Sequence, residues 1–392
     1  MQFNISDRMK ELRGSAIREM FKAMSDPQMI SLAGGNPAAE LFPKDEMARI
    51  AKDILENNPV AALQYGISEG NVQLREKITE IIKERENINC NLDEITIVSG
   101  GQQAIEICAK LFLNEGDCVI AEEPSFVGAL NAFRSYGAVI KGVKVDDDGM
   151  DTDALEKAIA ENKNVKLIYT IPNFQNPSGI TMSIEKRKRL LDIAVKNNIF
   201  VIEDNPYGEL TFTGEKLPTI KSMDTEGAVL YCGSFSKILA PGLRLGFLIA
   251  AKNVTEKIVL GKQVSDVHTS LLPQLIALEY LKKYDLGEHI EKLRALYKKK
   301  CGVMIDAIEK YLPEEVKHTT PEGGLFVWCS MEGIDALKIK DECMKKKVLI
   351  VPGNSFAADQ SKVSCGFRLN FSSTPDDIMV EGIKRLGEAL KK

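Results

Sequence analysis

Short runs of apolar residues alternate with longer amphipathic stretches between about residues 95 and 250. Apolar runs of five or six residues are typical of parallel β-strands that helices cover on both faces. Five such strands are predicted, at residues 94–99, 117–122, 166–171, 199–204 and 228–233. The pattern predicts an α/β fold with a large, doubly wound and mainly parallel sheet. Ligands of such sheets bind outside the carboxyl ends of the strands.

The pattern changes beyond about residue 285. A long charged helix is expected over residues 286–312 and ends before Pro313. A last helix is expected to begin at Thr374, whose hydroxyl would cap it, with Pro375 in its first turn. Between these helices lie three strand-like pieces, at residues 323–330, 348–353 and 366–372.

A chain of 392 residues is too long for one small core and fits two domains. Apolar residues at approximately helical spacing occur before residue 25, in a segment too short to form a core alone. We predict three parts: an N-terminal arm over residues 1–40 that docks on the smaller domain, a large domain over 41–284, and a small α+β domain over 285–392.

Charge and composition exclude several classes of function. The chain has 51 basic and 56 acidic residues, without the clustered basic excess that nucleic-acid binding requires. No apolar stretch is long enough to span a membrane, and the N-terminus lacks the apolar core of a signal peptide. The eight cysteines form no CxxC pair, and the three histidines lack ligand spacing, so neither a disulfide framework nor a metal site is expected. We therefore expect a cytoplasmic protein.

Polar and turn-forming residues gather where the predicted strands end. The first strand runs through Ser-Gly-Gly into a helix, whose unpaired N–H groups form a phosphate cradle near Gly101. Phe126 follows the second strand, where it either stacks on a planar ligand or packs against the next helix. The third strand ends in PNFQNPSG, where Asn173 or Asn176 can donate to a ligand oxygen.

The ends of the fourth and fifth strands add charged groups. Asp204 precedes Tyr207 by three residues, and a carboxylate at a buried strand end is costly unless it pairs with a helix N-terminus, an arginine or a protonated ligand nitrogen. Lys237 follows the fifth strand, where burial near other cations makes an amine nucleophilic toward aldehydes. The donors that a phosphate requires surround it, at Ser234, Ser236 and Arg244. An aldehyde, a phosphate, a ring nitrogen and a ring face together describe pyridoxal 5′-phosphate (PLP).

Several motifs in fixed order carry a resemblance to a known family. They are ISLAGGNP, QYG, SGGQQA, PNFQNPSG, EDNPYGEL, SFSKILAPGLRLG, GGLFVW and FRLNFS, which extend over nearly the whole chain. The chain resembles the fold type I PLP-dependent aminotransferases of class I/II, in the branch with 2-aminoadipate and kynurenine aminotransferases.

The resemblance implies a role for each cofactor residue. Lys237 would form the Schiff base with the cofactor aldehyde and later move the substrate α-proton. Asp204 would pair with the ring nitrogen, Asn176 and Tyr207 would bind the phenolic oxygen, and Phe126 would stack on the ring. The phosphate would be held by Gly101, Gln102, Ser234, Ser236 and Arg244. Relatives commonly have a hydroxyl residue at position 101, where this chain offers only a backbone N–H.

The resemblance also implies the substrate contacts. Arg368 matches the arginine that binds the substrate α-carboxylate, and Gly35 lies where the substrate packs against bare backbone. Arg18 either contacts a distal carboxylate or lies on a solvated helix face. A cis bond is implied at Asn176–Pro177, and Tyr65 matches a tyrosine that reaches the phosphate of the neighbouring subunit in a homodimer.

These features predict a ping-pong aminotransferase that moves an amino group between an L-amino acid and a 2-oxo acid such as 2-oxoglutarate. The expected amino acids are aromatic, 2-aminoadipate-like or of broad range. The alternatives are a PLP-dependent β-lyase, which shares the cofactor residues, and a non-catalytic regulator, for which a DNA-binding module is absent before the arm. A Rossmann-type dehydrogenase would need a glycine fingerprint that the sequence lacks.

Overall fold

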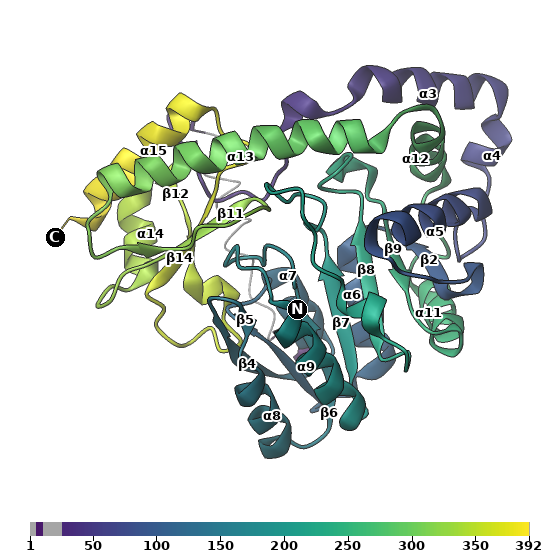
Figure 1. Cartoon of the computed structure of the whole chain (residues 1–392), viewed down its shortest axis with the longest axis horizontal. Coiled ribbons are helices and arrows are strands. Elements are labelled where there is room, and N and C mark those ends of the chain that lie inside the picture. The colour runs from purple at the N-terminus through teal and green to yellow at the C-terminus, as the bar shows by residue number, and fades with distance from the viewer. Residues whose placement is uncertain (1–4, 11–25, 392) are drawn as a thin grey trace.

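Figure 1 shows a chain built around two β-sheets of unequal size, in a computed structural model that describes residues 5–10 and 26–391. The helices are α1 (Asp7–Lys10), α3 (Lys44–Asn57), α4 (Pro59–Leu63), α5 (Val72–Glu86), α6 (Gly101–Phe112), α7 (Val127–Ser135), α8 (Thr152–Glu161), α9 (Ile184–Lys196), α10 (Ile220–Met223), α11 (Lys252–Ser265), α12 (Leu271–Lys283), α13 (Leu286–Tyr311), α14 (Ala336–Lys345) and α15 (Asp376–Leu390). The strands are β1 (Ile30–Ser31), β2 (Ile95–Val98), β3 (Cys118–Glu123), β4 (Val139–Asp146), β5 (Gly149–Met150), β6 (Val165–Thr170), β7 (Phe200–Asn205), β8 (Val229–Ser234), β9 (Gly246–Ile249), β10 (Lys317–His318), β11 (Phe326–Ser330), β12 (Val348–Leu349), β13 (Val351–Pro352) and β14 (Gly366–Asn370).

The large sheet has eight strands in the order β2-β9-β8-β7-β6-β3-β4-β5. Strands β4, β3, β6, β7 and β8 pair in parallel, whereas β9 is antiparallel to both of its neighbours. The prediction of a doubly wound, mainly parallel sheet is confirmed, and the five predicted strands match β2, β3, β6, β7 and β8 to within one residue. The sequence pattern missed β4, in which a single residue is buried, and β9, a short run after the Pro241-Gly242 break.

Helices cover both faces of this sheet because successive strand residues point in opposite directions. Leu230 and Cys232 pack with α6 and α7 in one core cluster. Their neighbours Val229 and Tyr231 face the other side. There α9 covers Val229, and α5 and α12 cover Tyr231. Two-sided burial explains why these strands are continuously apolar.

The small sheet is antiparallel in the order β10-β11-β14-β13 and packs with α13, α14 and α15. Helix α13 confirms the long helix predicted over 286–312 and runs from the α12 end of the large sheet to α15 (Figure 1). Strand β1, which precedes α3, pairs in parallel with β12. The division at residues 40 and 284 stays a prediction.

One detail of the last helix was predicted incorrectly. Helix α15 begins at Asp376, and its N-cap position is Pro375, which has no side-chain hydroxyl. Thr374 does not cap the helix, because its Oγ1 donates to the carbonyl of Ser31 at 2.8 Å. A long-range partner therefore replaced the local cap, and this hydrogen bond ties β1 to the start of α15.

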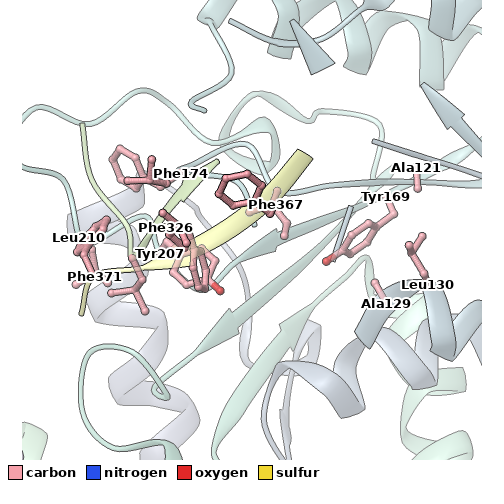
Figure 2. Packing of buried hydrophobic residues seen from close by; sticks show 14 of the residues in the cluster. Ala121, Ala129, Leu130, Tyr169, Phe174, Tyr207, Leu210, Phe326, Phe367 and Phe371 are labelled. Carbon is pink, nitrogen blue, oxygen red and sulfur yellow. The ribbon is translucent and has the colours of Figure 1, made fainter. Parts of the chain in front are cut away.

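The cores of the two sheets meet in one buried cluster. Figure 2 shows Tyr169 beside Leu130 at one end and Tyr207 beside Phe326 at the other. The rings of Tyr207 and Phe326 meet edge to face, with centroids 5.8 Å apart. The strand ends of the large sheet therefore face residues of the small sheet across this contact.

Within residues 5–10 and 26–391, no helix is both long enough and apolar enough to cross a bilayer.

The loop between β6 and α9 is held by one buried arginine. Arg187, on α9, is fully buried and donates to the carbonyls of Met182 (2.8 Å), Pro172 (3.1 Å) and Pro218 (2.9 Å). It also donates to Oδ1 of Asn173 at 2.7 Å. Three of these hydrogen bonds fix a loop that has no regular secondary structure of its own, and the fourth ties Arg187 to the segment before α10.

Replacing Arg187 with methionine is expected to lower the free energy of unfolding by about 3 kcal/mol, because several buried acceptors lose a charged donor. Urea denaturation measures the change. Arg189→Met is the matched control on the same helix: Arg189 pairs with Asp153 and Glu156 at the surface, with 45% of its side chain exposed. The control is expected to change stability by less than about 1 kcal/mol. Equal losses in the two variants would contradict the role given to Arg187.

Candidate active site

Lys237 follows β8 and lies half-buried at the carboxyl end of the large sheet. Its Nζ donates to the carbonyl of Gly35 at 2.6 Å. Burial, together with the positive charges of Arg368 and Arg244, lowers the pKa of Lys237 to about 8. The amine is therefore available as a nucleophile nearer to neutral pH than an ordinary lysine.

Asp204 lies in β7, next to β8, and is 5% exposed. Its Oδ2 accepts a hydrogen bond from the hydroxyl of Tyr169 on β6 at 2.7 Å. Burial raises the pKa of Asp204 to about 7, and the Tyr169 hydrogen bond opposes this rise. Among the described residues no lysine, arginine or histidine pairs with this carboxylate, so the site fits a protonated ring nitrogen.

Arg368, on β14 of the small sheet, brings a cation to the same place. Its Nη1 donates to Oδ1 of Asn176 at 2.8 Å and its Nη2 donates to the carbonyl of Ala33 at 2.6 Å. The Nε is buried and has no partner within the described chain. Burial lowers the pKa of Arg368 to about 10, and the guanidinium lies 4.2 Å from the ring centroid of Phe326.

A buried guanidinium with an unpaired N–H and no carboxylate beside it fits an anionic ligand. The peptide bond between Asn176 and Pro177 is cis, as predicted. Asn176 also donates from Nδ2 to the hydroxyl of Tyr207 at 3.4 Å. Arg368, Asn176 and Tyr207 thus form one connected group on the side of the site that faces the small sheet.

The turn after β2 forms the opposite side. Gly100 has φ +82°, and a Cβ there would lie 2.5 Å from Nη2 of Arg244. That guanidinium donates to the carbonyl of Ser99 at 3.1 Å. Helix α6 begins at Gly101, and a Cβ at this residue would lie 3.9 Å from Oδ1 of Asp204. A helix N-terminus beside an arginine is suited to hold a phosphate near the Asp204 carboxylate.

The remaining predicted cofactor residues lie around this turn. Gln102 donates to the carbonyl of Gly128 at 2.9 Å, and a side chain at 128 would collide with Gln102 and with the ring of Phe126. Ser234 ends β8, and its Oγ accepts from the backbone N–H of Ser236 at 3.1 Å. Because residue 128 is glycine, the side chains of Gln102 and Phe126 can both pack against the backbone at this position.

One predicted residue stands apart from this group. Tyr65 is 82% exposed, and its ring lies edge-on to His268 with centroids 5.9 Å apart. Arg18 lies outside the described residues.

Two partners were missed by reasoning from the sequence. The sequence pattern places Tyr169 in an apolar strand, although a buried tyrosine hydroxyl needs a polar partner, and this signal indicates a nearby polar group. Glu122 is the residue before the last of β3 and is 1% exposed. It accepts hydrogen bonds from Thr170 at 2.7 Å and Gln175 at 3.0 Å, which anchors the loop that carries Asn176.

The donor set fits PLP group by group. A lysine of lowered pKa suits the aldehyde, a buried carboxylate suits the ring nitrogen, and the α6 N-terminus with Arg244 suits the phosphate. The unpaired Nε of Arg368 is left for an anionic group of the substrate.

Comparison with known proteins agrees with this reading. The family model described as aminotransferase class I and II matches residues 27–386. Aromatic-amino-acid aminotransferase 1 of Thermococcus litoralis is 41% identical, over 99% of this chain and 94% of that protein. The 2-aminoadipate transaminase of Thermus thermophilus is 38% identical, over 97% of this chain and 94% of that protein.

A solved structure extends the similarity to the fold. The crystal structure of Pyrococcus horikoshii kynurenine aminotransferase, in complex with PMP, KYN and KYA, superposes with a TM-score of 0.94. It is 39% identical and covers 99% of this chain and 98% of that chain. The predicted resemblance is confirmed, and the α/β architecture is that of the fold type I enzymes. The chain belongs to the aminotransferase class I and II family, the PLP-dependent transaminases that act on amino acids and 2-oxo acids.

Proposed function

We propose that this aminotransferase moves the amino group of an aromatic, 2-aminoadipate-like or broader range of L-amino acids to a 2-oxo acid such as 2-oxoglutarate. The reaction runs as two half-reactions of a ping-pong cycle. The similarity to proteins named for aromatic amino acids, 2-aminoadipate and kynurenine supports this range. The observation that carries the proposal is the buried Arg368, with an unpaired Nε on the same site as the low-pKa amine of Lys237.

Lys237 is the catalytic base of the proposed reaction. When bound, PLP supplies an electron-accepting ring that stabilises negative charge at the substrate α-carbon. Nζ of Lys237 would hold the cofactor through its aldehyde and, as a free amine, would take the proton from the α-carbon of the amino acid. Its pKa near 8 leaves enough free amine near neutral pH to accept that proton.

Asp204 would keep a proton on the ring nitrogen, and Tyr169 orients the carboxylate of Asp204. Asn176 and Tyr207 would bind the phenolic oxygen, and Phe126 would stack on the ring. The residues proposed to hold the phosphate are Gly101, Gln102, Ser234, Ser236 and Arg244.

Arg368 binds the substrate α-carboxylate in this proposal, and Nε with one Nη forms the planar fork that a carboxylate accepts. Asn176 and the carbonyl of Ala33 fix the guanidinium from the other side. Gly35 leaves bare backbone beside Lys237, so that the substrate can approach. The choice between a distal-carboxylate contact and a solvated face for Arg18 stays a prediction.

We also propose a homodimer in which Tyr65 reaches the phosphate of the neighbouring subunit. Exposed apolar side chains support this assembly: Val60 is 72% exposed, Leu63 70% and Val264 79%. The contact between Tyr65 and His268 brings the segment after α4 next to the segment after α11, and these exposed side chains belong to the two helices that precede those segments. The predicted cytoplasmic location stays a prediction.

The first experiment follows the absorbance of the purified protein with PLP during addition of an amino-acid panel. We expect the band of the lysine-bound cofactor to convert to that of the amine form with glutamate, aromatic amino acids or 2-aminoadipate. Addition of 2-oxoglutarate is expected to restore the first band. Lys237→Ala is expected to lack the initial band, because no other amine replaces it at the aldehyde.

The other outcomes separate the alternatives. Release of pyruvate and ammonia without any oxo-acid acceptor would identify a β-lyase. A stable band that no amino acid changes would favour a non-catalytic regulator. A Lys237→Ala variant with the wild-type band would contradict the role given to Lys237.

Arg368→Gln is expected to raise the KM for L-phenylalanine by about 100-fold, because the α-carboxylate loses its charged partner. Half-reaction kinetics measure the change, and 2-phenylethylamine, which lacks the carboxylate, is the matched substrate control. Its rate is expected to stay within about threefold of the wild-type rate. An equal loss with both substrates would show that Arg368 does not bind the carboxylate.

Val264→Asp is expected to convert the dimer to a monomer, because a carboxylate would be buried in an apolar interface. Light scattering after size exclusion measures the mass. Val363→Asp is the matched control, at a residue that is 72% exposed on the small-domain side of the chain. A Val264→Asp variant that keeps the wild-type mass would contradict the proposed interface.

A further inference from the structure

A polar network lies behind the turn that joins β2 to α6. We call it the turn-support network, and it consists of Ser99, Gln103, Lys262, Asp266 and Thr269. Lys262, on α11, is its centre, and its side chain is fully buried. Its Nζ contacts both carboxylate oxygens of Asp266 at 2.9 Å and Oγ1 of Thr269 at 2.8 Å.

The network fastens both ends of the turn. Oε1 of Gln103 accepts from the backbone N–H of Ser99 at 2.7 Å and from Nζ of Lys262 at 3.0 Å. Asp266 accepts on Oδ2 from Nε2 of Gln103 at 2.8 Å and from Oγ of Ser99 at 3.2 Å. Gly100 to Gln102, which lie between Ser99 and Gln103 in the sequence, form the N-terminus of α6.

The opposite face of the same turn meets Arg244, whose Nη2 donates to the carbonyl of Ser99 at 3.1 Å. Ser99 is therefore held from behind the turn by Gln103 and Asp266. In front of the turn it is held by Arg244, which is proposed to bind the phosphate. Because an anion site depends on fixed backbone N–H directions, a shift of Ser99 or Gln103 would turn those N–H groups away.

The electrostatics agree with a rigid charged support. Burial lowers the pKa of Lys262, and the contact with Asp266 opposes this change. Burial acts to raise the pKa of Asp266, but the hydrogen bonds from Lys262, Gln103 and Ser99 outweigh it, so that this pKa is lowered. A buried lysine with four polar contacts is held in one position.

We propose that Lys262 and Asp266 are positioning residues for the phosphate of the cofactor. They act through Ser99 and Gln103 and do not touch the phosphate themselves. The inference rests on the proposed function, because it takes the turn at Gly100–Gln102 as the phosphate site. Loss of the pair is expected to weaken binding of the phosphate and to leave binding of the pyridoxal ring unchanged.

The test measures the dissociation constants of PLP and of pyridoxal, which lacks the phosphate, for the cofactor-free protein. Lys262→Met and Asp266→Asn are each expected to raise the constant for PLP by about tenfold, with pyridoxal within about twofold of wild type. Competition by inorganic phosphate is expected to weaken by the same factor. Lys110→Met is the matched control, because Lys110 bridges the same two helices through the carbonyl of Gly261 and Oγ of Ser265.

The outcomes separate this inference from the assignment of the site. Equal losses for PLP and pyridoxal, or an unchanged ratio of the two constants, would overturn the positioning role. A wild-type protein that binds PLP no better than pyridoxal would instead overturn the phosphate site at this turn. If Lys262→Met does not fold, the nearly isosteric Asp266→Asn decides by the same ratio, and an unchanged ratio there overturns the proposal.

Discussion

Burial of charge at the carboxyl ends of β7 and β8 is the constraint on which the site depends. Asp204 and Arg368 are 5% and 3% exposed, and neither has an oppositely charged partner within the described chain. Desolvation raises the pKa of Asp204 and lowers the pKa values of Lys237 and Arg368. A cofactor with a protonatable nitrogen and a substrate with a carboxylate would relieve these costs, which links binding to the stability of the site.

The fold tolerates this cost because the surrounding backbone is held by buried polar groups. Arg187 and Glu122 fix the loop that carries Asn176. Lys262 and Asp266 hold the turn at the start of α6 from behind. Each of these groups is satisfied by several hydrogen bonds, whereas Arg368 retains an unpaired Nε. Rigid support around incompletely satisfied groups is the arrangement that favours ligand binding over collapse of the site.

The site is assembled from both sheets. Lys237 and Asp204 come from the large sheet, whereas Arg368 and Phe326 come from the small sheet. Ala33 and Gly35, which precede α3, lie between them and accept from Arg368 and Lys237. Any movement of the small sheet relative to the large one would therefore change the distance from Arg368 to Lys237, and with it the position of a bound substrate.

The sequence by itself determined the parallel sheet, the long helix α13 and the set of polar residues at the strand ends. Strands buried on both faces are continuously apolar, and turn formers interrupt them sharply, so local composition carries this information. Motif resemblance added the proposed roles of Lys237 and Arg368, which stand 131 positions apart and share no local pattern.

Only the tertiary structure decided which partners these residues have. Tyr169 reaches Asp204 because β6 and β7 pair in a register that places Tyr169 opposite Ile202, two residues before Asp204 on the same face. The local pattern predicts Thr374 as a helix cap, but in the folded chain its hydroxyl donates to the carbonyl of Ser31. The support of the α6 turn by Lys262 joins residues 159 positions apart. Such contacts depend on strand register and helix packing, which a local pattern of apolar and polar residues does not encode.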